Sequence, residues 1–308
     1  FMINSEIRFL PSEKIAVSAW DQLVFEAENA SLYAYTWYLY MVAEDWSAIV
    51  LGDYDVVLPL VHRKKYGIQY IFPPAWTQQL GFISRRKIDE ECMRSMLQAI
   101  PKQFKYISLL LNSSNPKLDL KGAKTRNNFL LPIPDSEEEL RKKYSSQTKR
   151  NLKKAEKEQL QFFANERPEM LIDLFKQNKG KEIKAIKDKG YLKLKHLMYA
   201  SMHKGIGKVY SVYGPQNDLQ ASAFILSYFQ QSIFLFSGLN QWGRESGAMT
   251  YLIHQVLKER LALSHVFDFE GSDDKNLARF YSGFGAENFP YQEITINRLP
   301  FPLNLLKR

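Results

Sequence analysis

The chain has 308 residues, of which 45% are hydrophobic and 14% aromatic, and its formal net charge is +9. This length exceeds what one compact core usually holds, and the apolar content excludes a disordered chain, so two folded domains are expected. One cysteine excludes an internal disulfide, and the lack of a signal peptide or of any apolar run near ~20 residues predicts a cytoplasmic protein without a transmembrane segment.

The positive charge is concentrated in one part of the chain. Residues 141–195 contain 17 Lys and Arg against seven Asp and Glu, so the remainder is close to neutral. Such a concentration predicts an anionic partner for this region.

The first half is expected to open with antiparallel strands. Four apolar or alternating stretches predict them: 46–51, 54–62, 68–72 and 80–83. A helix is expected over 88–100 and a strand rich in Ile and Leu over 106–111. Residues 112–121 contain Asn-Ser-Ser-Asn-Pro and are expected to form an exposed linker between the halves.

Within the first half, residues 72–81 place two amide side chains, Gln78 and Gln79, in an otherwise apolar stretch. Buried amides need hydrogen-bond partners. A substrate is one such partner, and backbone groups are the commoner one.

The second half repeats the order of the first. A strand over 128–133 and a helical segment over 136–159 open it, the latter with acidic residues first and lysines later, which suits the helix dipole. The following elements are expected in this order: strands 208–214, 221–228 and 232–238, a helix over 249–263, a strand over 265–269, a helix over 277–284 and a closing strand over 291–297. A meander, a crossover helix and a strand occur once per half, which predicts a duplicated α/β fold with mixed sheets and domains 1–125 and 126–308.

A basic face is expected on the helical segment that opens the second half. Lys149, Lys153 and Lys157 fall at i, i+4 and i+8, with Arg150 and Lys154 beside them. Such a face attracts phosphate groups, and we expect Lys149 and Arg150 to bind a phosphate-bearing donor. The lysine-rich run 176–195 extends this surface or is a solvated loop and helix.

A glycine-containing loop over 240–248 joins a strand to an amphipathic helix. Gly247 and Ala248 let a ligand approach the backbone, and the free N–H groups of a helix start attract phosphate. The donor is expected to contact this loop and the end of the preceding strand, including Leu239, Asn240 and Arg244. An ordinary strand-to-helix turn with a solvated Arg244 is the alternative.

Acidic side chains follow the short strand 265–269. Glu270 stands where the carboxyl end of a buried strand faces the ligand crevice of an α/β sheet. It is a candidate to accept a proton from an attacking amine, directly or through a water. The alternative is a carboxylate that caps the next helix.

Residues 276–286, Asn-Leu-Ala-Arg-Phe-Tyr-Ser-Gly-Phe-Gly-Ala, resemble the last conserved motif of the GNAT acyltransferase superfamily. The resemblance implies that Asn276 orients the arm of coenzyme A and that Tyr281 protonates the leaving thiolate. A core aromatic on an amphipathic helix is the competing interpretation of Tyr281.

The pyrophosphate loop of that superfamily is written Arg/Gln-x-x-Gly-x-Gly/Ala. Arg244 and Gly247 match it, but Met249 stands where the last small residue is expected. Two such halves, with the segment 144–156 opening the second and Asp-Phe-Glu-Gly at 268–271, resemble the FemABX group. Members of that group transfer amino acids from aminoacyl-tRNA to peptidoglycan precursors or perform related acyl transfers.

These features predict an N-acyltransferase whose donor is an acyl-CoA such as acetyl-CoA, or an aminoacyl-tRNA. Its acceptor is an amine on a small molecule or a cell-wall precursor, with no role for DNA. The alternative is a catalytically inactive module that binds tRNA or an anionic precursor. No Gly-x-Gly-x-x-Gly, P-loop or Gly-x-Ser-x-Gly motif occurs, and the five histidines lack ligand spacing, so no metal is predicted.

Overall fold

The computed structural model describes residues 6–183, 186–263, 265–271 and 273–305. The chain divides into two compact units: unit 1 joins Phe1–Arg126 with Pro290–Arg308, and unit 2 is Asn127–Phe289. Each unit contains one mixed sheet, which confirms the predicted α/β fold with two mixed sheets.

Unit 1 is built on a sheet with the strand order β1-β2-β3-β4-β6-β15-β7, and β5 pairs with β3. Its strands are β1 (Ile7–Pro11), β2 (Asp45–Leu51), β3 (Val56–Lys65), β4 (Ile68–Ile71), β5 (Ile83–Ser84), β6 (Phe104–Leu110), β7 (Lys124–Arg126) and β15 (Tyr291–Asn297). Its α-helices are α1 (Val17–Glu26), α2 (Thr36–Val42) and α3 (Glu90–Gln98). Only β4 and β6 run parallel among the neighbouring strands described here.

Unit 2 is built on a sheet with the order β14-β8-β13-β12-β11-β10-β9, in which β12 and β13 are parallel. Its strands are β8 (Phe129–Pro132), β9 (Gln161–Ala164), β10 (Gly207–Tyr213), β11 (Leu219–Tyr228), β12 (Gln231–Leu239), β13 (Val266–Asp268) and β14 (Glu287–Asn288). Its helices are α4 (Glu137–Lys143), α5 (Ser146–Lys157), α6 (Pro168–Gln177), the 3-10 helix η3 (Lys179–Lys181), α7 (Asp188–His203), α8 (Gln241–Ser246), α9 (Ala248–Lys258) and α10 (Lys275–Ser282).

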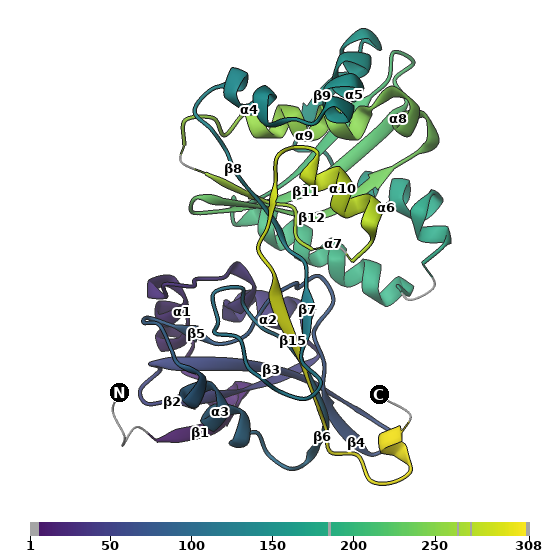
Figure 1. Ribbon diagram of the computed structural model, residues 1–308. Helices are drawn as coiled ribbons and strands as arrows, with labels where there is room; N and C mark the ends of the chain where they lie inside the picture. The colour runs from purple at the N-terminus through teal and green to yellow at the C-terminus, as the bar shows by residue number, and fades with distance from the viewer. Residues whose placement is uncertain (1–5, 184–185, 264, 272, 306–308) are drawn as a thin grey trace. The chain divides into compact units, whose positions relative to one another are not determined.

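Helices cover both faces of the unit 2 sheet. Figure 1 shows α5 and α9 over one face and α6 and α7 over the other. Residues 220–226 of β11 are therefore all buried, although their side chains alternate between the faces. In the sequence, a strand that is buried on both faces has a continuous apolar run instead of alternating apolar and polar residues.

The two sheets repeat the same plan strand by strand. Counted from β1 in unit 1 and from β9 in unit 2, each sheet has three antiparallel pairings followed by one parallel pairing. Two further strands complete each sheet: β15 and β7 in unit 1, and β8 and β14 in unit 2. The crossover helix between the parallel strands is α3 in unit 1 and α9 in unit 2. The predicted duplication of topology is therefore present in the structure.

The last β-strand of the chain, β15, belongs to the sheet of unit 1. β15 pairs with β6 and β7 in unit 1, whereas the preceding β14 pairs with β8 in unit 2. The prediction that 291–297 closes the sheet of the second half is wrong, because an alternating pattern indicates a half-buried strand but not its partner. The units thus differ from the predicted halves, 1–125 and 126–308, in that Pro290–Arg308 joins unit 1.

Two helical predictions differ from the structure because of local capping. The segment 136–159 forms two helices, since Tyr144 has extended backbone angles and the Ser145 hydroxyl accepts a hydrogen bond from the Thr148 amide at 3.1 Å. This interaction caps a new helix at Ser145. The helix expected over 249–263 begins at Ala248 and ends at Lys258.

Candidate functional site

In each unit the parallel strands separate at their carboxyl ends, which is where α/β sheets bind ligands. In unit 2, β12 and β13 pair as far as Ile233 and Asp268. The chain after β13 then stays with β8, since the Phe269 amide donates to the Phe129 carbonyl at 2.9 Å. The space between the diverging segments is the position at which a donor was expected.

Aromatic side chains occupy this divergence in unit 2. Tyr281 stacks on Phe269 with ring centroids 5.0 Å apart, and Phe234 of β12 lies 6.5 Å from Tyr281. Tyr281 is 8% exposed, and burial, followed by the Glu270 and Asp274 carboxylates, raises the pKa of its hydroxyl. The Tyr281 ring thus packs in the core of unit 2. The observation that favours a catalytic role is the Glu270 carboxylate, which contributes to the raised pKa of the hydroxyl.

Glu270 lies at the carboxyl end of β13, half-buried. Its amide donates to the Asp268 carboxylate at 2.7 Å and its carbonyl accepts from the Phe129 amide at 3.1 Å, which together hold its left-handed backbone at a φ of 59°. The Glu270 carboxylate also contributes to the raised pKa of the Tyr281 hydroxyl, so the two predicted residues lie in the same part of unit 2. Asn276 is exposed in the first turn of α10, and its amide donates to the Asp274 carboxylate at 2.8 Å.

The expected phosphate loop is folded into a helix. Arg244 is exposed near the end of α8, and Gly247 joins α8 to α9 with a φ of 82°. The Gly247 amide donates to the Gly243 carbonyl at 3.1 Å, and a Cβ at Gly247 would stand 2.7 Å from the Asn151 carbonyl of α5. Ala248 is buried. The backbone of α5 therefore lies against Gly247 at the start of α9.

The strand end before this loop also uses its polar groups internally. The Asn240 amide donates to the Gln220 carbonyl at 3.1 Å. The Asn240 side chain accepts from the Gly243 amide at 2.8 Å and donates to the Leu219 carbonyl at 2.9 Å, so it caps α8 and fixes it to β11. Leu239 is half-buried and packs against the unit 2 core.

The basic face of α5 is present as predicted. Lys149, Arg150, Lys153, Lys154 and Lys157 are all exposed. The Arg150 guanidinium donates to the Gln147 side chain at 2.8 Å, and within the described residues none of these five cations forms an ion pair. Their charge is therefore available to an anionic partner.

In unit 1, Gln79 is used to hold loops together. Its amide donates to the Gln78 side chain at 3.0 Å and its carbonyl accepts from the Ser113 amide at 2.8 Å. The Gln78 amide nitrogen is buried without a hydrogen-bond partner among the residues described. The Ser113 amide is thus the backbone partner of the Gln79 side chain, and backbone groups are the commoner partners of buried amides.

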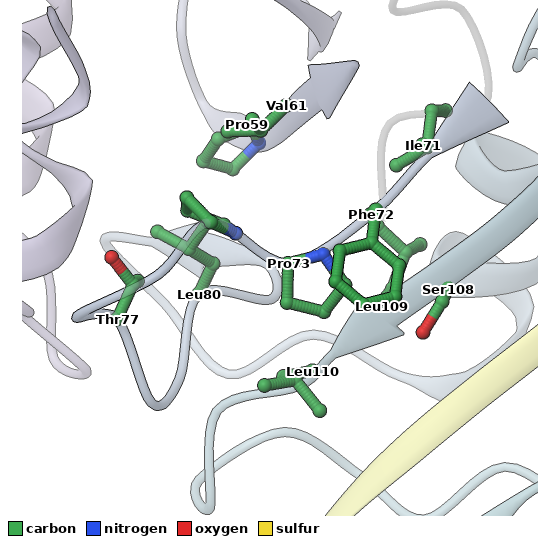
Figure 2. Close-up of a pocket in the computed structure, with 11 residues that line it drawn as sticks. Pro59, Val61, Ile71, Phe72, Pro73, Thr77, Leu80, Ser108, Leu109 and Leu110 are labelled. Carbon is green, nitrogen blue, oxygen red and sulfur yellow. The ribbon is translucent and has the colours of Figure 1, made fainter. Parts of the chain in front are cut away.

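A small apolar cavity lies near these residues, where β4 and β6 diverge (Figure 2). Val61, Ile71, Phe72 and Leu109 contribute apolar side chains to it, and Thr77 also lines it. Its volume is about 20 Å³, which is room for about one water. A substrate does not enter this cavity without movement of the loop after β4.

A buried histidine cluster of unit 2 was missed by the sequence predictions. His254 of α9 is 1% exposed, and its Nδ1 lies 2.9 Å from the Tyr144 hydroxyl while its Nε2 lies 3.2 Å from Glu137 Oε1. Burial, aided by the Arg141 cation, lowers the pKa of His254 to about 4 against the opposing Glu137 charge. Although burial opposes it, hydrogen bonds from Lys258 and Arg141 lower the pKa of Glu137 to about 2.

Asp268 is a second buried titratable group, at the end of β13. Burial raises the pKa of its carboxyl to about 7, although the Glu270 amide and the Gln231 side chain, at 2.9 Å, donate to it. Its place at a strand end was visible in the sequence, but its complete burial was not. Asp268 lies beneath Glu270 and holds that residue's backbone.

An open pocket of unit 2, about 710 Å³ in volume, was also not predicted. It lies between α6, η3, the start of β11 and the start of α8. Its lining combines apolar, amide and charged side chains: Met170, Asp173, Leu174, Gln177, Asn178, Lys181, Leu219, Asn240, Gln241 and Trp242. Among the predicted residues it includes Asn240.

Residues 6–183, 186–263, 265–271 and 273–305 contain neither a metal-binding cluster nor a membrane-spanning helix. Within these ranges no group of three or more His, Cys, Asp and Glu side chains is arranged to hold a metal ion. Within the same ranges no helix combines the length and apolarity needed to span a bilayer.

Comparison with solved structures identifies the fold. The chain is similar to FemX, with a TM-score of 0.68, 12% identity and coverage of 98% of this chain and 99% of that one. It is also similar to a tandem GNAT protein from the clavulanic acid biosynthesis pathway (TM-score 0.55, 11% identity, 96% and 99% covered). A third similar structure is L-PGS from Bacillus licheniformis (TM-score 0.54, 10% identity, 94% of each chain covered).

These likenesses extend over both units, so the chain has the tandem GNAT fold seen in FemX. No protein-family profile and no curated protein matches the sequence significantly. At these identities the shared feature is the fold, and the chemistry has to be argued from the residues.

Proposed function

We propose that this chain is an N-acyltransferase that moves an aminoacyl or acyl group to an amine acceptor. The observation that carries the proposal is the duplicated GNAT plan over the whole chain, in the arrangement shared with FemX. The resemblance to the FemABX group favours an amine on a peptidoglycan precursor as the acceptor.

Three features support aminoacyl-tRNA over an acyl-CoA as the donor. Phe234, Phe269 and Tyr281 fill the divergence of β12 and β13, and α5 covers the start of α9 at Gly247. A thioester donor in the expected position fits these surroundings poorly. The unpaired cations of α5 form a long exposed surface, which suits a polyphosphate backbone better than one compact cofactor.

The reaction then needs one proton acceptor and one proton donor. The acceptor amine attacks the ester carbonyl of the donor, the new N–C bond forms, and the C–O bond to the ribose breaks. In this proposal Glu270 takes the proton from the amine and the Tyr281 hydroxyl gives one to the leaving oxygen.

The burial of Tyr281 also favours a second candidate function. A chain in which this hydroxyl stays within the aromatic cluster binds tRNA or an anionic precursor without transferring anything. Binding without turnover separates this candidate from the transferase.

The test is transfer of a radiolabelled acyl group to an amine acceptor, with charged tRNA and acetyl-CoA compared as donors. We expect transfer from charged tRNA, and Glu270→Gln should lower turnover by about 10²-fold or more with unchanged tRNA affinity. Tyr281→Phe should lower turnover likewise. Tight tRNA binding with no transfer from either donor would support the binding module, and transfer from acetyl-CoA alone would refute the proposed donor.

The role of α5 has its own test in the salt dependence of tRNA binding. Lys149→Gln/Lys153→Gln should reduce the slope of log affinity against log salt by about 1.4–1.8, since each lost phosphate contact removes about 0.7–0.9. Lys64→Gln/Lys65→Gln, which removes two exposed lysines of β3 in unit 1, is the matched control. Equal slopes for both double variants would remove α5 from the interface.

A further inference from the structure

One end of the unit 1 sheet carries positive charge without any acidic residue. Three segments meet there: 62–72 with the β3–β4 turn, 99–111 with the start of β6, and 294–305 with the end of β15 and the 3-10 helix η4 (Leu303–Leu305). β4 pairs with β6, and the Arg298 amide donates to the Lys105 carbonyl at 2.8 Å, so these segments lie side by side (Figure 1). We call this region the basic end of unit 1. Its three segments contain no Asp or Glu and six basic residues: Arg63, Lys64, Lys65, Lys102, Lys105 and Arg298.

Four of these cations are available to a partner. Arg298 is used internally, because its guanidinium donates to the Ile100 carbonyl at 3.1 Å. By contrast, four lysines are exposed and form no ion pair within the described part of the chain: Lys64, Lys65, Lys102 and Lys105. A cluster of cations without carboxylates creates a positive potential, which attracts an anionic partner.

The hairpin at this end projects beyond the strand beside it. β2 begins at Asp45, which pairs with His62, whereas β3 continues for three more residues to Lys65. The turn and the two lysines before it therefore have no strand next to them on the β2 side. This position makes the turn accessible to a flat surface.

The turn itself exposes an aromatic ring where the backbone favours other residues. Lys65 pairs with Ile68, so Tyr66 and Gly67 form a two-residue turn, with φ of 51° and 78°. Such turns favour Asn, Asp and Gly, because a bulky side chain is strained at positive φ. The Tyr66 ring is 91% exposed, with the Lys65 ammonium 5.2 Å from its centroid. The fold does not need a tyrosine at this position, so the ring is available for a contact outside the chain.

The segment after β15 adds more apolar surface at the same end. Phe301 is 80% exposed, and Leu303 and Leu305 are 37% and 48% exposed. Large apolar side chains that gather on a surface mark contacts with a membrane or with another protein. The basic end thus combines exposed apolar side chains with unpaired lysines.

An anionic lipid surface accounts for both kinds of group. Aromatic and aliphatic side chains insert at the level of the headgroups, while lysine side chains reach the lipid phosphates. Single-stranded RNA would use the lysines and the Tyr66 ring, but Leu303 and Leu305 offer it neither stacking nor hydrogen bonds. A protein partner is disfavoured because the centres of protein interfaces are depleted of lysine. The combination therefore favours lipid.

We propose that the basic end of unit 1 binds the surface of an anionic lipid bilayer. Tyr66, Phe301 and Leu305 insert among the headgroups, and the four exposed lysines contact the lipid phosphates. The proposal concerns binding by unit 1 and does not depend on acyl transfer.

The test is co-sedimentation of the full chain with vesicles of phosphatidylcholine alone, or with phosphatidylglycerol in place of a third of the lipid. We expect binding to the anionic vesicles only, and this binding should weaken as the salt concentration rises. Lys64→Gln/Lys65→Gln should weaken it by about 5-fold per lysine removed, or about 25-fold in total.

Substitutions of Tyr66 separate lipid contact from folding. Tyr66→Asn places a residue that suits the turn, so the urea midpoint should stay the same or rise. Vesicle binding should nevertheless fall by about 5-fold or more, because the ring is lost. Tyr66→Phe should keep most of the binding, and Phe301→Ser should weaken it as Tyr66→Asn does.

A matched control removes two cations elsewhere in unit 1. Arg86 and Lys87 are exposed and follow β5, which pairs with the start of β3, at the opposite end of that strand from Tyr66. Arg86→Gln/Lys87→Gln changes the net charge as much as Lys64→Gln/Lys65→Gln does. It should leave vesicle binding unchanged.

Three results would overturn the proposal. The first is a folded protein, checked by circular dichroism, that does not bind the anionic vesicles or binds both kinds equally. The second is vesicle binding that Lys64→Gln/Lys65→Gln and Tyr66→Asn leave unchanged. The third is binding of an RNA oligomer, weakened by Lys64→Gln/Lys65→Gln, without vesicle binding, which would assign the basic end to RNA.

The vesicle assay and the transfer assay fail independently. An inactive transferase that still binds anionic vesicles through the basic end would refute the proposed function and keep the lipid surface. An active transferase that ignores the vesicles would do the reverse.

Discussion

The buried His254 makes the stability of unit 2 depend on pH. Its ring is 1% exposed, and burial together with the Arg141 cation lowers its pKa to about 4. In the unfolded chain the pKa returns to about 6.5. The folded state therefore binds this proton more weakly than the unfolded state, so stability is complete above pH 6.5 and is lost as the pH falls toward 4.

The size of the effect follows from these two values. One unit of pKa difference corresponds to about 1.4 kcal/mol, so His254 alone lowers the free energy of unfolding by about 2 kcal/mol between pH 7.5 and pH 5. Glu137 adds a loss at lower pH, because its pKa of about 2 keeps it ionised until the solution is strongly acidic. The loss from Glu137 begins only below its ordinary pKa of 4.5, so the range from pH 7.5 to 5 isolates the histidine.

The measurement is urea unfolding followed by circular dichroism at pH 7.5 and pH 5, for the wild type and His254→Gln. Burial also lowers the pKa of His62 and His265, so the comparison uses the difference between variants and not the wild-type change alone. The variant should lose about 2 kcal/mol less than the wild type between the two pH values. His196→Gln, on an exposed position of α7, should behave like the wild type.

Equal losses in the wild type and His254→Gln would refute the reasoning. That result would mean that His254 has the same pKa in the folded and unfolded states, with the Glu137 carboxylate offsetting burial and Arg141. A larger loss in the variant than in the wild type would mean that His254 and Glu137 form an ion pair, and the sign of the contribution would be reversed.

Three further predictions concern single positions in unit 2. Gly247→Ala should lower the free energy of unfolding by more than Gly205→Ala does. Both glycines have a positive φ, but only a Cβ at Gly247 would stand 2.7 Å from a backbone carbonyl, that of Asn151. Urea unfolding measures the difference, and about 1–2 kcal/mol is expected for Gly205→Ala. Tyr281→Ala should cost about 3–5 kcal/mol by loss of ring packing, while Tyr281→Phe should cost less than about 1 kcal/mol in the same assay. Asp268→Asn should stabilise the protein more at pH 8 than at pH 5, because a carboxyl whose pKa is raised from 3.8 to about 7 on folding loses stability progressively as the pH rises between these values, and thermal unfolding at both pH values checks it.

Local patterns in the sequence were sufficient for most strands and for the basic helix. The alternation and apolar runs of β10, β11 and β12 predict strands within one or two residues of their observed bounds. The spacing of Lys149, Lys153 and Lys157 predicts one exposed face, which α5 presents. These features depend on neighbours within a few residues, which is the range over which sequence periodicity carries information.

Features that depend on distant partners were not predicted. Nothing near β15 indicates that it pairs with β6 in unit 1, because strand partners are chosen by tertiary packing. The His254 cluster joins Glu137 and Tyr144 to a residue more than a hundred positions away, and each of these residues looks ordinary in its own segment. The sequence predicts that Gly247 shapes a phosphate-binding loop. In the structure its positive φ allows α8 to be followed directly by α9, and the residue lies against α5.

The duplication explains why the two diverging strand pairs differ. The same pair of parallel strands opens in both units, but in unit 1 the loop after β4 leaves a small apolar cavity, while in unit 2 the rings of Phe234, Phe269 and Tyr281 pack across the opening. Glu270, at the carboxyl end of β13, stays half-buried at this packed opening. The exposed cations of unit 2 lie on α5, so the phosphate groups of a donor are expected to bind there, while the acyl group has to reach Glu270.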